Sequence, residues 1–242
     1  MQVALITVGD ELLAGDTENT NATWLATRLT ERGTRVERVV VVPDETDAIS
    51  AEVARLSAAY DAVLATGGIG PTHDDVTMDG VADAFGRELA EHPDAVEYFE
   101  AHGRYEFADL TEGTTHLPAG ARLLENTEGV APGAVVENVY VLPGVPVEMQ
   151  AMFDSIADEF SGPGTHVEFV TVDAPESSLL SAVQELRDRY DVTVGSYPGD
   201  DVRVKIQHED PDVAREAAAW FEERVQGRCR PSRRPRAAGR RW

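Results

Sequence analysis

Apolar and polar positions follow two different rhythms along the first third of the chain. Runs of apolar or β-branched side chains at residues 3–8, 35–42 and 61–66 predict three strands. Residues 19–32 and 46–58 instead repeat apolar side chains every three to four positions, as an amphipathic helix does. A further helical stripe follows the third strand. Strands that alternate with helices of this length predict βαβ units and a largely parallel sheet.

The pattern becomes less regular after that helix. Residues 92–104 predict another helix, whereas residues 105–120 match neither rhythm. Residues 123–142 predict strands around turns, with a hairpin in GAVVENVYVL. The following PGVP stretch starts a helix that runs to about Phe160.

A second pattern begins after the Gly-Pro-Gly break that ends at Gly164. A strand, a helix, two strands and a helix follow one another, and this order predicts a separate small domain. The chain is therefore expected to have three parts: a main domain at residues 1–164, a small β-α-β-β-α domain at 165–226, and a tail at 227–242.

Charge adds to this picture, because the chain carries a net charge of -23. Lys205 is the only lysine, and the acids are spread along the chain without forming a block. This distribution favours adaptation to high salt over an acidic face for a basic partner. Direct binding to nucleic acid is not expected, because phosphates and carboxylates repel each other.

The tail breaks the acidic pattern. Residues 227–242 hold seven arginines and no acid. A disordered basic arm, a polyanion-binding tail and a terminus in the wrong reading frame all remain open, and in each case we expect disorder.

Nothing in the sequence indicates a membrane protein. No apolar run approaches the ~20 residues that a spanning helix needs. The N-terminal MQVALITVGDELL lacks the basic start and the cleavage site of a signal peptide. We expect a soluble, cytoplasmic protein, and the single Cys229 excludes an internal disulfide.

Four loops fall at the carboxyl ends of predicted strands, where ligands bind in doubly wound sheets. They are Gly9–Glu18, Pro43–Asp47, Gly67–Asp75 and Pro143–Pro146. The third reads GGIGPTHDD, whose glycines would let backbone amides approach a phosphate. Its aspartates would hold a divalent cation that bridges to that phosphate.

A structural interpretation of the same residues stays open. Glycine turns after strands are common, and paired aspartates before a helix are ordinary N-caps. In the same way, Thr46 or Asp47 is expected to cap the helix at 46–58. Pro143 and Pro146 can simply mark a strand-to-helix junction, and Glu148 can be a first-turn acid.

Four stretches occur in the order and spacing found in one known family. GDELLAGDTENTN, GGIGPTHDDVT, NTEGVAPG and LPGVPVEM resemble the amino-terminal domain of CinA, the competence/damage-inducible protein A, over about residues 1–170. That domain is part of the molybdopterin-binding MoaB/Mog-like superfamily. The resemblance implies a three-layer α/β/α fold with a mostly parallel sheet and a homo-oligomer. The following small domain resembles a KH-type domain but lacks a GXXG loop, so this likeness does not predict RNA binding.

The resemblance also implies site residues and an activity. Asp44 and Asp75 would hold magnesium, or else manganese or cobalt. From their place on the loop after the first strand, Asp10 or Glu11 would be a further ligand or the general base, or else a helix-capping or surface acid. Metal-dependent hydrolysis of the pyrophosphate in ADP-ribose is the activity associated with such domains. The residues expected to bind phosphate or ligand are Gly67, Gly68, Gly70, Thr72, Asp74, Thr77, Asn21, Pro143, Gly144 and Pro146.

Two other functions use the same loops. One is molybdopterin binding and adenylylation in cofactor biosynthesis, and the other is a non-catalytic module that binds a nucleotide or pterin phosphate. The carboxy-terminal deamidase domain of longer CinA proteins is not represented in the sequence, so hydrolysis of nicotinamide mononucleotide is not expected.

Overall fold

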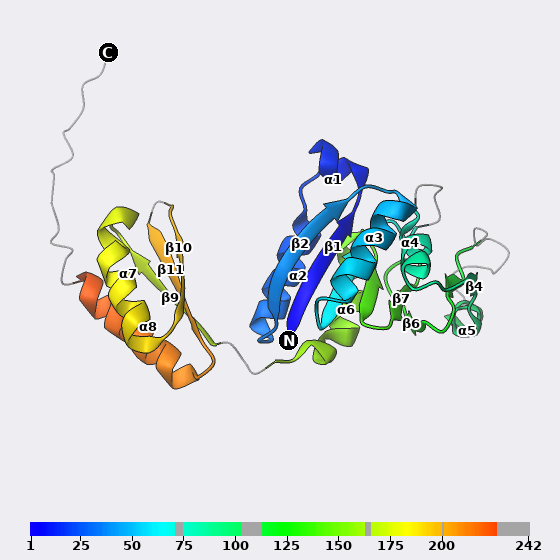
Figure 1. Cartoon of the computed structure of the whole chain (residues 1–242). Coiled ribbons are helices and arrows are strands. Elements are labelled where there is room, and N and C mark those ends of the chain that lie inside the picture. The colour runs from blue at the N-terminus through cyan, green and yellow to red at the C-terminus, as the bar shows by residue number, and fades with distance from the viewer. Residues whose placement is uncertain (71–74, 103–112, 163–165, 200, 227–242) are drawn as a thin grey trace, which may run out of the picture. The chain divides into compact units, whose positions relative to one another are not determined.

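The computed structural model describes residues 1–70, 75–102, 113–162, 166–199 and 201–226. The chain divides into two compact units, Met1–Gly162 and Pro163–Trp242 (Figure 1). Each unit has its own sheet and its own core and is described by itself.

Within the described residues, the first unit is built on a six-stranded sheet of order β2-β1-β3-β8-β7-β6. The first four of these strands run parallel; β7 pairs antiparallel with β8, and β6 pairs antiparallel with β7. This arrangement confirms the α/β class and the mostly parallel sheet, with the expected hairpin formed by β7 and β8. The strands are β1 (Gln2–Val8), β2 (Arg35–Val42), β3 (Ala62–Thr66), β6 (Arg122–Leu124), β7 (Gly133–Val136) and β8 (Val139–Leu142).

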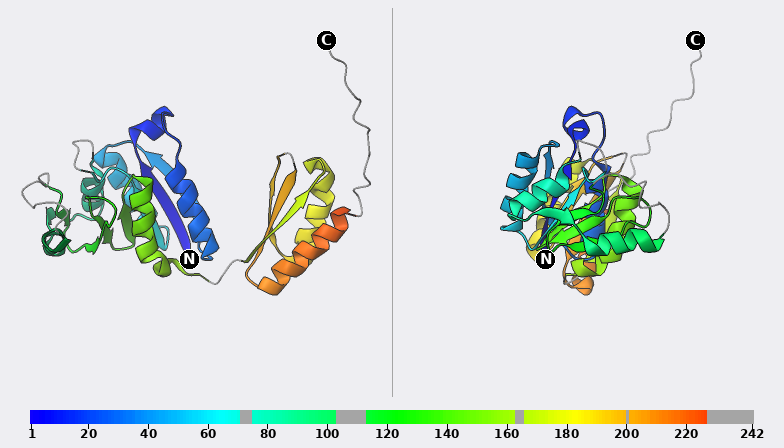
Figure 2. Two further views of the ribbon diagram at one scale, coloured as in Figure 1. Left: turned by 180° about the vertical axis from the view of Figure 1, so that it is seen from behind. Right: turned by 90° about the vertical axis from the view of Figure 1, so that its right-hand side faces the viewer.

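Helices cover both faces of this sheet and make three layers (Figures 1 and 2). On β1, Ala4 and Ile6 belong to the core shared with α3 and α4, whereas Val3 and Leu5 belong to the core shared with α2 and α6. The alternation follows from the two-residue repeat of a strand. The helices are α1 (Asp10–Ala14), α2 (Thr20–Glu31), α3 (Thr46–Ser57), α4 (Thr77–Ala84), α5 (Pro93–His102) and α6 (Pro146–Ile156), which continues as the 3₁₀ turn η2 (Ala157–Phe160). A two-stranded ribbon joins β4 (Leu89–Glu91) to β5 (His116–Pro118).

Two local expectations were wrong. The segment Gly9–Glu18 is not all loop, because it contains the short helix α1, which ends at Gly15 with a φ of 77°. The cap of α3 is Glu45 and not Thr46 or Asp47. The backbone N–H of Ile49 donates to the Glu45 carbonyl, so the helical hydrogen bonds start one residue earlier and Thr46 lies inside the first turn.

The second unit contains β9 (His166–Val172), α7 (Glu176–Tyr190), β10 (Thr193–Tyr197), β11 (Val202–His208) and α8 (Pro211–Gln226). Its three strands form an antiparallel sheet of order β10-β11-β9. Phe221 of α8 and Leu186 of α7 pack on Val204 and Ile206 of the central strand. The tail at residues 227–242 lies outside the described residues.

No helix in the described part of the chain has the length and apolar character needed to cross a bilayer.

Tyr140 on β8 provides a titration test of the packing between β8 and η2. Its hydroxyl donates to Oε2 of Glu159 at 2.9 Å. Burial, and then this carboxylate, raise the pKa of Tyr140 to about 12 from 10.0. Because the folded state keeps this proton more tightly, the group stabilises the fold fully below pH 10.0, and the stabilisation is lost as the pH rises towards about 12. Phenolate absorbance should therefore show a late component that Tyr140→Phe removes and Glu159→Gln shifts to lower pH. If Tyr140→Phe instead removes a component that titrates near the ordinary pKa of 10.0, the pKa of Tyr140 is not raised and the prediction is wrong.

Candidate functional site

A cleft of about 280 Å³ opens at the carboxyl ends of β1 and β3. These two strands lie at the point where the connections change direction, since β2 is on one side of β1 and β3 on the other. Ligands in doubly wound sheets bind at such a point. The lining residues are Thr7, Val8, Gly9, Glu11, Leu12, Thr17, Glu18, Asn19, Thr20, Asn21, Asp44, Thr66, Gly67, Gly68, Asp75, Gly144 and Pro146.

The turn Gly67–Gly68 forms the floor of the cleft and depends on both glycines. Their φ values are 97° and 62°, in the region that L side chains rarely adopt. A Cβ on Gly67 would lie 2.4 Å from the carbonyl oxygen of Val8, and one on Gly68 would lie 2.5 Å from Oγ1 of Thr77. The backbone therefore approaches β1 and α4 more closely than any other residue type would permit.

Thr77 supports this turn from below. Its hydroxyl donates to the Gly67 carbonyl at 2.8 Å, and its backbone N–H donates to the Gly68 carbonyl at 2.9 Å. The side chain is buried and does not line the cleft. Thr77, expected to bind ligand, thus holds the turn in place because its hydroxyl is already used.

The amide of Gly67 is also already used. Its N–H donates to the carbonyl of Leu142 at 3.2 Å, which joins the turn to the end of β8. Three glycines were expected to bind a phosphate through their amides. Of these, Gly68 lines the cleft, and its amide does not take part in the hydrogen bond to Leu142. Gly70 lines a neighbouring cavity of about 200 Å³ instead.

Asp44 and Asp75 reach the cleft from two separate segments. Oδ2 of Asp44 accepts the backbone N–H of Asp10 at 2.9 Å. Its Oδ1 faces the glycine turn, 3.4 Å from the position of a Cβ on Gly68. Asp75 is half-buried and lines both the cleft and the neighbouring cavity. A Cβ on Gly70 would lie 2.8 Å from Oδ2 of Asp75, so Gly70 leaves room for this carboxylate.

The start of α2 forms the opposite wall. Asn19 caps the helix by accepting the N–H of Ala22 at 3.1 Å, and its amide donates to Oγ1 of Thr7 at 2.9 Å. Asn21 donates to the Gly144 carbonyl at 2.7 Å, while its own Oδ1 is buried without a hydrogen-bond partner among the described residues. These two amides join α2 to β1 and to the PGVP segment, and they present the first turn of the helix to the cleft.

The neighbouring acids Asp10 and Glu11 differ in their position relative to the cleft. Glu11 lines the cleft, and its carboxylate folds back so that a Cβ on Gly9 would lie 2.6 Å from Oε1. Asp10 is exposed and contributes its backbone N–H to Asp44, but its side chain does not line the cleft.

Only some of the remaining expected site residues line the cleft. Gly144 and Pro146 line the cleft, whereas Pro143 is buried at the end of β8. Thr72 and Asp74 lie outside the described residues. The sequence did not single out several residues that the cleft contains, namely Thr7, Thr17, Glu18, Asn19, Thr20 and Thr66. Most of them belong to the GDELLAGDTENTN stretch, where a ligand-facing residue cannot be told from a loop residue by type.

The NTEGVAPG stretch has a structural role centred on Asn126. Its buried amide donates to the Ala131 carbonyl and to Oε2 of Glu148, and its Oδ1 accepts the N–H of Gly129. Glu148, in the first turn of α6, thus ties the loop to that helix and does not line the cleft.

The donor set suits a hard cation that arrives with a phosphate. In the part of the chain that the structure describes, no three His, Cys, Asp or Glu side chains form a ready metal cage. Magnesium is typically held by one or two carboxylates together with substrate phosphates and water. Four carboxylates, from Glu11, Glu18, Asp44 and Asp75, line the cleft, so an anionic ligand would need such a cation to enter it.

Comparison with known proteins agrees with this fold. The family model described as "Probable molybdopterin binding domain" matches residues 4–161. A protein of Archaeoglobus fulgidus is 39% identical over 225 residues, which cover 92% of this chain and 97% of that protein. A "CinA-like protein" of Citrifermentans bemidjiense is 40% identical over 175 residues, which cover 67% of this chain and 41% of that longer protein. The crystal structure of CinA from Thermoplasma acidophilum matches with a TM-score of 0.60 and 36% identity, over 66% of this chain and 97% of that one.

Proposed function

Because the chain belongs to the molybdopterin-binding domain family and is similar to its CinA members, we propose that it is a divalent-metal-dependent hydrolase of a nucleotide pyrophosphate such as ADP-ribose. The observation that carries this proposal is the meeting of Asp44 and Asp75 on one cleft beside the Gly67–Gly68 turn.

The residues of the cleft can share the reaction between them. Asp44 and Asp75 would hold the cation, which when bound polarises a phosphoryl oxygen and offsets the charge of the pyrophosphate. Gly68 and the first turn of α2 would orient the phosphate, because the positive end of the helix dipole lies there.

Glu11 is the candidate general base. It lines the same cleft as the two aspartates, and it would accept a proton from the attacking water. The new P–O bond forms as the bond from phosphorus to the bridging oxygen breaks, and the second phosphate leaves as an anion. ADP-ribose would thus give AMP and ribose 5-phosphate.

The expected result is equimolar AMP and ribose 5-phosphate from ADP-ribose with Mg²⁺, Mn²⁺ or Co²⁺, and none after chelation. The assay is best run both in dilute buffer and in molar KCl, because a chain of net charge -23 repels an anionic substrate unless salt screens it. Chromatography of the products decides the result. The absence of AMP with every metal in both buffers contradicts the proposal.

Molybdopterin is the second candidate ligand, and the description of the matching family model favours it. Incubation with ATP and molybdopterin would then give pyrophosphate and an adenylylated pterin, while ADP-ribose would stay intact. Saturable binding of either ligand without turnover would instead indicate a non-catalytic module.

A further inference from the structure

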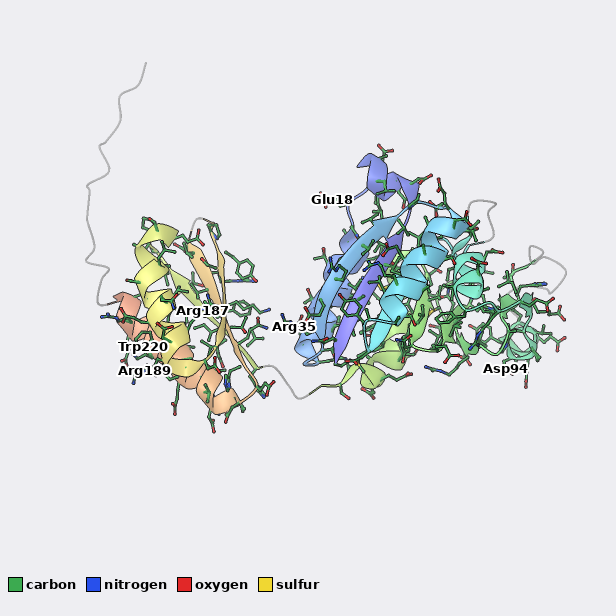
Figure 3. All side chains as sticks on the ribbon, in the orientation of Figure 1. Glu18, Arg35, Asp94, Arg187, Arg189 and Trp220 are labelled. Carbon is green, nitrogen blue, oxygen red and sulfur yellow. The ribbon has the colours of Figure 1, made fainter. Side chains whose placement is uncertain are left out.

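The sheet of the second unit has one covered face and one open face. Alternate residues of β9 and β11, among them Val170, Val204 and Ile206, point towards α7 and α8 and are buried. The intervening side chains point away from the helices, and Figure 3 shows side chains standing out on that side of the sheet. These residues, here called the open face, are Val167, Phe169, Thr171, Thr193, Gly195, Tyr197, Arg203, Lys205 and Gln207.

The open face has a charge opposite to that of the chain. None of its residues is acidic, although the chain holds 44 acids, and it contains the only lysine. Neither Arg203 nor Lys205 forms an ion pair with another described residue. Burial, and then the neighbouring Arg203, lower the pKa of Lys205. An anion at this position would therefore relieve a repulsion that the protein itself leaves uncompensated.

Two aromatic rings flank these cations. Phe169 and Tyr197 are 49% and 50% exposed, which is high for such large side chains. Phe169 and Gly195 pair with Lys205 from opposite sides in the ladder. Tyr197 lies back along its strand over Gly195, where a Cβ would be 3.3 Å from the ring carbon Cε2. The two rings thus lie in one row with Lys205 between them.

Arg203 completes the surface. Its guanidinium carbon lies 4.4 Å from the centre of the Phe169 ring, a cation–π contact that fixes the arginine on the face. The guanidinium N–H groups remain available to a phosphate, because they make no ion pair among the described residues.

We propose that the open face binds single-stranded nucleic acid, with bases on Phe169 and Tyr197 and phosphates on Arg203 and Lys205. Base stacking needs only an exposed ring, and a neighbouring cation holds the backbone phosphate. A peptide fits this face less well, because the backbone groups of a sheet lie in its plane and the face offers none of them to a peptide chain.

Both units are acidic, but this charge does not extend onto the open face. Residues 1–162 carry 30 acidic and 8 basic side chains, a balance of -22. Residues 163–226 carry 14 acidic and 6 basic side chains, a balance of -8, and only the seven arginines of residues 227–242 bring the second unit to -1. The expectation that nucleic acid is not bound rests on the net charge, whereas the open face itself carries two cations and no acid.

The test mixes the whole 242-residue chain with fluorescein-labelled RNA or DNA strands of about 12 nucleotides, a length in the range of known single-strand sites, and measures the fluorescence anisotropy. Phe169→Ala and Tyr197→Ala should each weaken binding roughly fivefold or more, because each removes one stacked base. Arg203→Gln with Lys205→Gln should reduce the slope of log affinity against log salt by about 1.4, since each phosphate contact contributes about 0.7. A strand carrying 2-aminopurine should lose its stacking-dependent quenching in the ring variants.

Matched controls are available on the helices. Leu180→Ala removes a side chain on α7 that is 66% exposed, and Arg215→Gln removes a cation from α8. Both should bind as the wild type does. The arginines of residues 227–242 are present in every variant, so binding through them alone would leave the series unchanged and overturn the proposal. The proposal is also overturned if neither the RNA nor the DNA strand binds. It is overturned as well if the chain prefers a glutamate- and leucine-rich peptide of matched length and the same variants weaken the binding of that peptide.

Discussion

Asp75→Asn is expected to reduce AMP release from ADP-ribose by about a hundredfold or more, because an amide keeps the shape of the carboxylate but not the charge that holds a cation. Asp75 is the one candidate ligand that lines both the cleft and the cavity beside it. The measurement is the initial rate at saturating substrate over a range of Mg²⁺ concentrations. A partial loss that excess Mg²⁺ restores would assign Asp75 to metal affinity alone.

The control for this variant is Asp47→Asn. Asp47 is exposed in the first turn of α3 and does not line the cleft. It should keep the wild-type rate, and thermal melts should show that both variants are folded. Full activity of Asp75→Asn would remove the proposed metal role.

The second large effect concerns stability. Gly67→Ala should lower the free energy of unfolding by roughly 3 kcal/mol or more, because it combines an unfavourable backbone conformation with a steric clash. The new Cβ would lie 2.4 Å from the Val8 carbonyl oxygen, and β1 cannot move aside because it is buried and paired with β2 on one side and β3 on the other. Denaturant unfolding followed by circular dichroism measures the change.

Gly86→Ala separates the two contributions. Gly86 has a φ of 60°, but a Cβ there would meet nothing within 4 Å. Its substitution should cost only the backbone term, about 1–2 kcal/mol. Equal stability of the two variants would mean that the close approach of Gly67 to β1 is not needed.

The fold could be predicted in outline because the sheet core leaves a strong pattern. The runs at 3–8 and 61–66 are apolar because β1 and β3 are buried on both faces, and the helical stripe of α2 faces one side only. The short helix α1 escaped prediction because five residues are too few to show a helical repeat. Glu45 was not predicted as the cap of α3 because its side chain makes no capping hydrogen bond, so the position does not require one of the usual capping residue types.

The site was predicted less completely than the fold. The glycine turn and the aspartates could be found because few residue types satisfy a positive φ or hold a hard cation. The roles of Gly67 and Thr77 could not, since they depend on the carbonyl of Leu142 and on the turn itself. Asn19 was missed because its amide contacts Thr7, a pairing that exists only after α2 has packed on β1.

The hydrogen bond from Asn21 to the Gly144 carbonyl has a consequence for synthesis of the chain. The two residues are 123 positions apart, so the wall that they form requires nearly the whole first unit. A nascent chain that has not yet extended past β8 and the start of α6 therefore lacks a complete cleft. A ligand can therefore stabilise this unit only after nearly all of it has left the ribosome. Most of the sheet must form before that point without stabilisation by the ligand.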